Sequence, residues 1–369
     1  MINQLSNLAD TLKQREHLLA AKKVTIGFDG FIDTIAKIIH NKEEQSIAFF
    51  NRIKEFGNYI LEKEGSSFSL ELQEISVRHG GNMPITANAL GQLGIQVNCI
   101  GATGYPRIHP AFESISPNCS FYSFAEPGTS AAYEFNDGKI FLASMGKLNS
   151  TGWNEIKSRV GLDTLIQLYK ECDLISIVNW SEIDLSSEIW KGILKDILPA
   201  YTGPHKKQIA FFDLSDCSKR TGKEISEVFS LLEEFSLYTK VILSVNRNEA
   251  RLLHKVLYKK DSHDDLAQLG QSIFQKLQTN TLVVHSSKEA IAYNNEEMFK
   301  AGSFFTETPV ISTGAGDNFN AGFCAAQLSA LDMQSSVIFA NAVSGLYIRT
   351  GASPMLKDVI RFFETNPDY

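Results

Sequence analysis

The segment Ser312–Phe323 places small residues and one carboxylate where a loop is expected to become a helix. A helix start presents unpaired backbone N–H groups and the positive end of the helix dipole, and Gly314, Ala315 and Gly316 leave room for a phosphate there. Asp317 beside that anion would accept the proton of an attacking hydroxyl. The alternative is that the glycines only shape a tight turn and that Asp317 favours the first helical turn. The segment predicts either a phosphoryl-transfer site or such a turn.

Short apolar runs alternate with helix-like stretches along most of the chain. Buried strands separated by helices indicate right-handed βαβ units and a mostly parallel sheet covered on both faces, which is an α/β fold. The expected strands are 24–28, 97–101, 174–178, 209–213, 241–245 and 282–285, and the expected helices are 47–63, 85–93, 162–169, 187–198, 266–277 and 318–328. Leucines at near-helical spacing predict an additional amphipathic helix over about residues 4–20.

Two segments depart from this alternation. Residues 67–79 alternate apolar and polar side chains, and residues 120–144 read as strands with a hairpin turn at Asn136-Asp137-Gly138. We expect them to form a small antiparallel lid over the carboxyl ends of the main strands, where open α/β sheets bind their ligands. Because no linker or internal repeat divides the chain, we expect one domain over residues 1–369.

Three motifs in order carry a family resemblance: GGN at 80–82, N-x-x-E at 246–249 and TGAGD at 313–317. Over about residues 24–353 the chain resembles the PfkB (ribokinase-like) family of carbohydrate kinases. The resemblance implies a three-layer α/β/α sandwich with a small β-sheet lid. It also implies transfer of the γ-phosphoryl group of ATP to a hydroxyl of a sugar or nucleoside.

Carried over by position, Asp317 matches the catalytic base of that family, and Gly314, Ala315 and Gly316 match its anion hole. Both roles suit phosphoryl transfer, in which positioning and electrostatics supply most of the rate. The resemblance also implies that Asn246 and Glu249 organise Mg²⁺, through water, together with the nucleotide phosphates. Taken alone, N-x-x-E is more typical of an Asn helix cap followed by an acidic first turn.

On the acceptor side, Asp33 matches the family's aspartate that hydrogen-bonds sugar hydroxyls, and Asp29 is a second candidate. At least one of this pair is expected only to end the strand in a turn. Gly80 and Gly81 match the di-glycine at which the backbone approaches the sugar. Ile85 stands where the family commonly has an Asn, and Asn82 is the candidate to replace that contact.

On the nucleotide side, the family's glycine-rich turn is replaced by a segment with Ser286 and Glu289 where glycines are usual. Ser286 is retained as a nucleotide contact, and Asn341 and Gly351 match the family's adenine-side helix and loop. Ile311 stands where K⁺-activated members carry an Asp, which argues against strong activation by a monovalent cation. No Walker A sequence is present.

Composition excludes several classes of protein. The chain has 35 basic and 42 acidic residues and a formal charge of -7, so no basic field would hold a nucleic acid or an anionic membrane. Its five cysteines form no C-x-x-C pair, so neither a disulfide framework nor a zinc site is expected. No stretch approaches the length of a membrane span. We expect a cytoplasmic protein.

The sequence leaves the acceptor open. A sugar kinase is expected first, and a nucleoside kinase on the same fold is the main alternative. A noncatalytic sugar- or nucleotide-binding homologue is a third reading, motivated by Ile85, Ser286, Glu289 and Ile311. Because lids of this family often pair between subunits, we also expect a homodimer through the lid.

Overall fold

The computed structural model describes residues 2–43, 46–201, 208–262, 265–295 and 297–366. The strands are β1 (Lys23–Phe28), β2 (Phe31–Glu43), β3 (Ser46–Phe49), β4 (Leu72–Gly80), β5 (Gln96–Gly101), β6 (Cys119–Ser123), β7 (Gly128–Phe135), β8 (Gly138–Ser144), β9 (Leu174–Ile177), β10 (Ile209–Asp213), β11 (Lys240–Asn246), β12 (Thr281–His285), β13 (Glu289–Tyr293) and β14 (Met298–Gly302). The helices are α1 (Ile2–Ala20), α2 (Ile53–Glu62), α3 (Asn82–Gln92), α4 (Trp153–Val160), α5 (Leu162–Glu171), α6 (Ser186–Gly192), α7 (Leu198–Tyr201), α8 (Gly222–Ser236), α9 (Arg247–Tyr258), α10 (Leu266–Phe274), α11 (Ala315–Leu328), α12 (Met333–Thr350) and α13 (Leu356–Thr365).

The main sheet has the strand order β14-β13-β12-β11-β10-β9-β1-β5-β6. The pairs from β12 through β6 are parallel, and β13 and β14 add an antiparallel edge. The expected mostly parallel sheet is therefore confirmed. Its central strands are apolar runs because both of their faces are covered, as burial throughout β9 illustrates.

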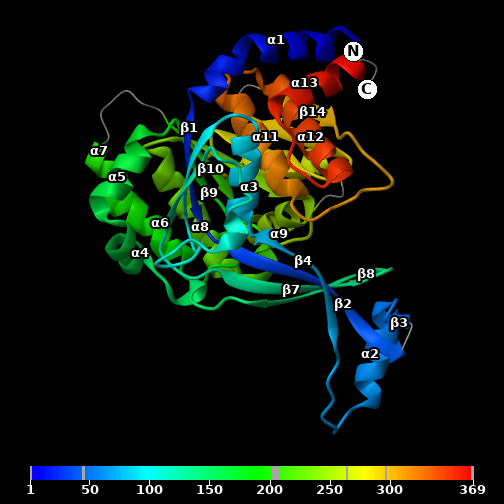
Figure 1. The fold of residues 1–369 in the computed structure, drawn as a ribbon. Helices are drawn as coiled ribbons and strands as arrows, with labels where there is room; N and C mark the ends of the chain where they lie inside the picture. The colour runs from blue at the N-terminus through cyan, green and yellow to red at the C-terminus, as the bar shows by residue number, and fades with distance from the viewer. Residues whose placement is uncertain (1, 44–45, 202–207, 263–264, 296, 367–369) are drawn as a thin grey trace.

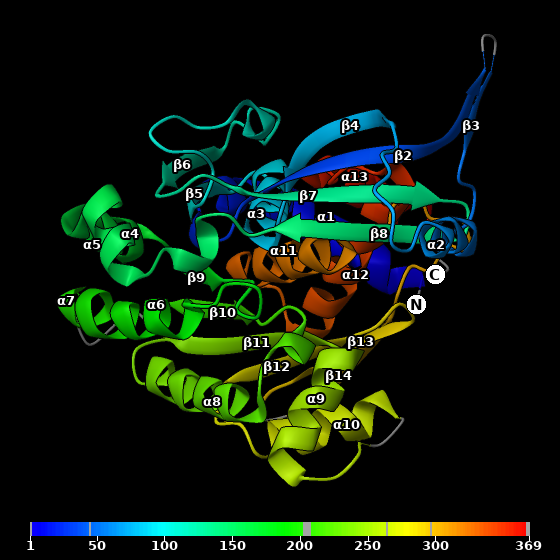
Figure 2. The same cartoon turned by 90° about the horizontal axis from the view of Figure 1, so that it is seen from below.

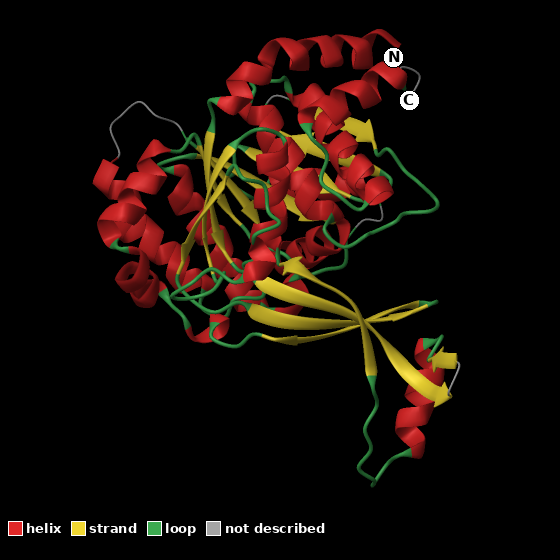
Figure 3. Ribbon diagram, in the orientation of Figure 1, coloured by secondary structure: helices red, strands yellow, loops and turns green. Residues whose placement is uncertain are grey.

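Helices cover the two faces of this sheet (Figures 1 and 3), and two hydrophobic cores join them to it. One core joins α4, α5, α6, α8, α9 and α10 to the sheet, and the other joins α1, α3, α11, α12 and α13 to the opposite face. The three-layer α/β/α architecture is thus confirmed. The amphipathic helix expected at 4–20 is α1, which lies along α13 and buries Leu5, Leu8, Leu12 and Leu19.

A second, smaller sheet of β2, β3, β4, β7 and β8 projects from the body beside the carboxyl ends of the main strands (Figure 2). We call it the lid. Its longest strand, β2, follows β1 after two residues and pairs with β4, β7 and β3. The sequence analysis missed β2, because apolar residues in 31–43 follow no clear period of two.

Of the segments predicted for the lid, 67–79 contains most of β4, and 120–144 contains β7 and β8 joined at Asn136-Asp137. The first strand of the second segment differs from the expectation. β6 pairs in parallel with β5 and is the edge of the main sheet. An edge strand alternates buried and exposed side chains just as a lid strand does, so the pattern could not separate the two positions.

The helix predicted over 47–63 is wrong in its first part. Residues 46–49 form β3, which pairs with the far end of β2, and the helix begins only at Ile53. The side chain of Asp137 accepts a hydrogen bond from the backbone N–H of Ile53 at 3.0 Å, which fixes that helix start against the β7–β8 turn. Across the described ranges, no helix is long and apolar enough to cross a membrane.

Candidate active site

Asp317 lies in the first turn of α11, directly after the glycine segment. Gly314 caps the helix with a φ of 87°, a conformation that favours glycine, and a methyl group on it would lie 2.7 Å from the Tyr347 hydroxyl. That hydroxyl donates to the carbonyl of Thr313 at 2.8 Å, and the Ser344 hydroxyl donates to the carbonyl of Ala315 at 2.9 Å. Helix α12 thus fixes the backbone that starts α11.

The Asp317 carboxylate is buried, with 8% of the residue exposed, and faces the start of α3. The Thr86 hydroxyl donates to Oδ1 of Asp317 at 3.4 Å, and the Asn82 side chain also hydrogen-bonds to this carboxylate. Burial holds the pKa of Asp317 well above its usual range, and the charges of Asp213 and Asp29 raise it further. Such a carboxylate is poised to accept a proton once it is ionised.

The carboxylate of Asp29 binds the backbone at the start of α3. Its two carboxylate oxygens accept from the backbone N–H groups of Asn82 at 2.8 Å and Met83 at 2.7 Å, and the Asn179 amide donates to it at 2.6 Å. Burial raises the pKa of Asp29 to about 6, and these three donors oppose that shift. In the structure Asp29 holds the start of α3, whereas the sequence analysis expected at least one aspartate of the pair only to end the strand in a turn.

Asp33 lies on β2 in the lid, and its side chain hydrogen-bonds to Ser130 of β7. Burial raises the pKa of Asp33, while Ser130 and the charge of Arg78 lower it. The two adjacent glycines make room for the two aspartates. A methyl group on Gly80 would lie 2.3 Å from Asp33 Oδ2, and one on Gly81 would lie 2.6 Å from Asp29 Oδ2.

Asn246 and Glu249 form the start of α9 as a reciprocal cap. The Asn246 side chain accepts from the N–H of Glu249 at 3.1 Å, and the Glu249 carboxylate accepts from the N–H of Asn246 at 2.8 Å and from its side-chain amide. Burial holds the pKa of Glu249 well above its usual range, and the charge of Asp213 adds to the shift. The helix cap is thus present at these residues, and Glu249 is a buried carboxyl close enough to Asp213 to be affected by its charge.

Asp213 ends β10, and its charge raises the pKa of both Glu249 and Asp317. It accepts from the N–H of Ser215 at 2.7 Å and from the side chain of Asn320, whose own oxygen accepts from the Ser244 hydroxyl at 2.7 Å. Burial raises the pKa of Asp213 to about 6. Among the residues that the structure describes, no three His, Cys, Asp or Glu side chains converge to hold a metal ion directly.

A pocket of about 340 Å³ opens on the other side of the α11 start. It includes the predicted residues Asn246, Ser286, Ala315, Gly316 and Asn341. The remaining lining residues are His285, Ser287, Ser303, Phe304, Phe305, Thr306, Pro309, Ser312, Phe319, Ser344, Gly345 and Ile348. Its mixture of apolar walls and a helix start suits a nucleotide, with the base on the apolar side and the phosphates towards α11.

Two predicted nucleotide contacts have evident structural roles. The Ser286 hydroxyl donates to the carbonyl of Glu289 at 3.0 Å and so closes the β12–β13 turn, although the residue also lines the pocket. Gly351 ends α12 with a φ of 76° and is not among the residues that line the pocket. The Asn341 amide donates to the carbonyl of Gly302 at 3.0 Å, which leaves its side-chain oxygen available.

The sequence analysis did not single out three residues of the site. Thr86 is one turn after Asn82 on α3, so the helix start could have suggested it. Ser130 follows from the β2–β7 register, in which it pairs with Asp33. His285 ends β12 in the pocket, with its ring stacked on Phe319 at 4.7 Å between centroids, and burial lowers its pKa to about 4.

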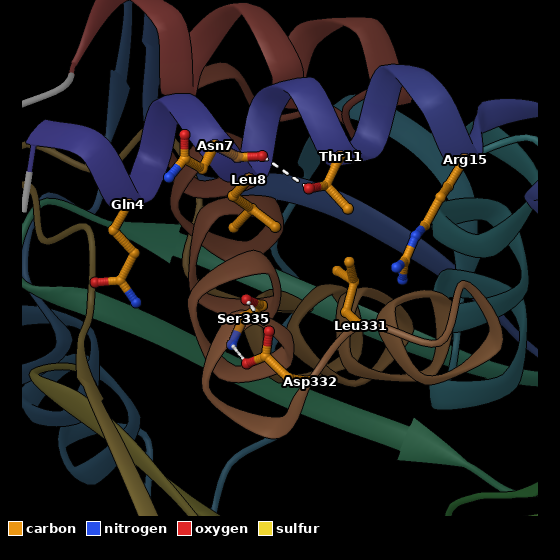
Figure 4. Close-up of a pocket in the computed structure, with 8 residues that line it drawn as sticks. All are labelled: Gln4, Asn7, Leu8, Thr11, Arg15, Leu331, Asp332 and Ser335. Carbon is orange, nitrogen blue, oxygen red and sulfur yellow. Dashed lines mark hydrogen bonds between the residues drawn. The ribbon is translucent and has the colours of Figure 1, made fainter.

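Another hollow lies between α1 and the start of α12 (Figure 4). Its main polar groups are engaged in structural contacts. Arg15 donates to the carbonyls of Ser329 and Ala330 at 2.8 and 2.7 Å, and Asp332 accepts from the N–H of Ser335 at 2.8 Å. It shares no lining residue with the pocket beside α11.

The fold is ribokinase-like. A ribokinase of Arabidopsis thaliana solved with ribose and ATP superposes with a TM-score of 0.64 at 16% identity, over 93% of this chain and 98% of that one. An Escherichia coli protein assigned as ribokinase II, solved with ATP and Mg²⁺, gives a TM-score of 0.60 at 17% identity, over 94% and 99% of the two chains.

The match to a family model assigns the chain to one family within the ribokinase-like fold. Residues 6–366 match the family model of prokaryotic ketohexokinases, and the chain belongs to that family. A ketohexokinase of Haloferax volcanii is 29% identical over 353 residues, which cover 94% of this chain and 92% of the relative. The chain is therefore an ATP-dependent sugar kinase that transfers a phosphoryl group to a hydroxyl, as the PfkB resemblance predicted.

Proposed function

We propose that the chain phosphorylates a ketohexose, with Asp317 as the general base. The observation that carries this proposal is the buried Asp317 carboxylate, which lies between the α3 start, with Asn82 and Thr86, and the glycine turn at Gly314. The ketohexokinase relative and the family model support a ketohexose as the acceptor.

In the proposed reaction, Asp33 accepts hydrogen bonds from sugar hydroxyls, and Asn82 orients the hydroxyl to be phosphorylated towards Asp317. That hydroxyl forms a bond to the γ-phosphorus while its proton passes to the Asp317 carboxylate. The bond between the γ-phosphorus and the β,γ-bridging oxygen breaks, and ADP leaves with the electron pair. The N–H groups at the start of α11 stabilise the charge on the transferred group.

The two buried carboxyls of Asp213 and Glu249 fit a magnesium ion held through water. Burial raises the pKa values of both carboxyls, the charge of Asp213 raises that of Glu249 further, and a divalent cation would relieve that repulsion. Asn246 adds an amide oxygen at the same edge. When bound, Mg²⁺ neutralises charge on the nucleotide phosphates.

The test is an ADP-release assay with ATP, Mg²⁺ and a panel of ketoses, aldoses, sugar phosphates and nucleosides. Turnover with a ketohexose, lost in D317N, supports the proposal. Turnover with nucleosides alone would overturn the acceptor assignment. ATP binding without any phosphoryl transfer would overturn the kinase role.

We also propose that the lid forms a homodimer contact. β4 and β8 are the edge strands of the lid and carry exposed apolar side chains at Leu72, Ile75, Val77, Phe141 and Leu142. The substitutions V77E and L142E should convert a dimer to a monomer in sedimentation velocity. A wild-type monomer at micromolar concentration would contradict the proposal.

The cytoplasm is the proposed location. All five cysteines are free thiols, including the partly exposed Cys119, and ATP is a cytoplasmic substrate. A fractionation experiment with a tagged chain would test this assignment.

A further inference from the structure

A row of polar side chains crosses the inner face of the lid. In the antiparallel β2–β4 pair Asp33 lies opposite Arg78, and in the parallel β2–β7 pair it lies beside Ser130. Directly paired residues share a face of a sheet, so the side chains of Arg78 and Ser130 lie on the same face of the lid as the carboxylate of Asp33. The preceding residue of β4, Val77, lies on the opposite face of the lid from Arg78, and 46% of it is exposed.

Arg78 is a half-buried cation with no contacting anion. In the described part of the chain, no side chain or carbonyl hydrogen-bonds to its guanidinium, and no carboxylate lies within ion-pair distance of it. The nearby carboxylate of Asp33 is instead hydrogen-bonded to Ser130. A partly desolvated guanidinium without a partner is costly to keep unless an anion arrives there.

The field of Arg78 reaches both sides of the reaction site. It lowers the pKa of Asp33 on the lid, against the larger effect of burial. It also opposes the burial that raises the pKa of Tyr347 to about 12. Because Arg78 pairs with Asp33 across the β2–β4 ladder and the Tyr347 hydroxyl donates to the carbonyl of Thr313 beside Gly314, this cation acts on groups at both the acceptor aspartate and the glycine turn.

The reaction brings an anion into that gap. The γ-phosphoryl group of ATP must pass from the α11 start to the sugar, and the charge on its oxygens needs compensation throughout the transfer. Among the described lining residues of the nucleotide pocket there is no Lys or Arg. Arg78 on the lid would therefore supply the cationic side chain that the described lining of this pocket lacks.

We propose that Arg78 is a catalytic residue whose guanidinium binds the oxygens of the γ-phosphoryl group during its transfer to the acceptor hydroxyl. The proposal rests on the sugar-kinase site described above. Arg78 exchanges no proton: the acceptor proton passes to Asp317, the new bond joins the acceptor oxygen to phosphorus, and the bridging oxygen leaves with ADP. The planar fork of arginine suits two phosphoryl oxygens at once.

The test compares R78Q, R78K and R78A with wild type in the ADP-release assay, with a ketohexose as acceptor. We expect kcat to fall on the order of 10²- to 10³-fold in R78Q, with the KM for the sugar and the Kd for ATP changed less than about threefold. R78K keeps the charge but not the two-pronged guanidinium, so its kcat should lie between those of wild type and R78Q. Added guanidinium ion should restore turnover at least about tenfold in R78A and not in R78Q.

The matched control is K37Q, which removes a lid cation that lies over the Phe49 ring on exposed β2 surface. It should leave kcat unchanged. Melting curves of all variants report folding, and if R78Q does not fold, R78K and the rescue of R78A decide.

Three outcomes would overturn the role of Arg78. The first is unchanged kcat in R78Q, and the second is a raised sugar KM with kcat intact. The third is a loss of activity only with acceptors that already carry a phosphate or carboxylate. That result would mean that Arg78 binds the anionic group of the acceptor and not the γ-phosphoryl group. A wild-type protein without turnover on any sugar would overturn the proposed function and the role of Arg78 with it. If wild type is active and only the expected effect of R78Q is missing, the role of Arg78 alone is wrong.

Discussion

The carboxylate of Asp29 accepts the backbone N–H of Asn82 at 2.8 Å, so the end of β1 fixes the start of α3. Met83 and Asn179 donate to the same carboxylate. Since α3 carries the side chains that meet Asp317, Asp29 controls the site through the position of a helix. Asp33, four residues later, lies on β2 in the lid beside Ser130.

Because Asp29 holds the backbone of α3 and Asp33 is the proposed sugar ligand, replacing them should have different effects. In D29N, an amide NH₂ group would face backbone donors, so at least one buried N–H group loses its acceptor. We expect a loss of about 2 kcal/mol in the free energy of unfolding, with a lower kcat. In D33N, we expect nearly unchanged stability and a sugar KM raised about tenfold or more. Urea titration and steady-state kinetics measure both. A raised sugar KM with normal stability in D29N would instead make Asp29 a direct sugar ligand.

Replacing the proposed base should stabilise the protein while it stops the reaction. Burial raises the pKa of Asp317 in the folded state, so the charged form is disfavoured by folding at neutral pH. D317N removes that penalty and also the base, and we expect kcat to fall on the order of 10²- to 10⁴-fold.

The pH dependence of the melting temperature tests whether folding raises the pKa of Asp317. For a carboxyl whose folded pKa is raised, the penalty is absent below the unfolded pKa and complete above the folded one. The gain in melting temperature of D317N over wild type should therefore be largest at pH 7 to 8 and should shrink as the pH falls towards about 4. A gain that is constant with pH would show that folding does not shift the pKa of Asp317.

Two neighbours of Asp317 should move the pH profile in opposite directions. Thr86 donates a hydrogen bond that lowers the pKa of Asp317, and Asp213 carries a charge that raises it. The acidic limb of kcat/KM should move to higher pH in T86V and to lower pH in D213N, each by less than about one unit. D216N, which changes an exposed carboxylate three residues from Asp213, is the control and should leave the limb in place. Shifts of the same sign in T86V and D213N would reject Asp317 as the titrating base.

The sequence predicted the parts of the fold that local patterns determine. Strands such as 209–213 and 241–245 are buried on both faces, so they are short apolar runs that stand out between helices. The start of α11 was predictable because glycines and a following apolar face mark a loop that becomes a helix. The strand over 31–43 was missed because it contacts the body near Phe31 and solvent beyond Ile39, so its burial changes along its length.

The parts of the site that depend on packing between distant segments were not predictable. Asp29 and Asp33 both follow β1 in sequence, and only the course of the chain sends one under α3 and the other into the lid. The contact of Thr86 with Asp317 joins residues 231 positions apart through the packing of α3 on α11. The di-glycine was expected to approach the sugar, but its tightest neighbours are the two aspartates.

The glycines that flank Ala315 should respond differently to the same substitution. At Gly314, a methyl group would lie 2.7 Å from the Tyr347 hydroxyl and the backbone φ is 87°, so G314A should destabilise the fold and abolish activity. At Gly316, the nearest atom is Cε1 of His285 at 3.6 Å, which is ordinary contact. G316A should therefore fold with a normal melting temperature.

Gly316 also lines the nucleotide pocket, so the added methyl group of G316A would occupy space beside the α11 start. We expect the Kd for ATP, measured by calorimetry, to rise about tenfold or more while sugar binding is unchanged. Normal ATP affinity in a folded G316A would mean that the phosphates do not approach this backbone, and the anion-binding role of the α11 start would then be wrong.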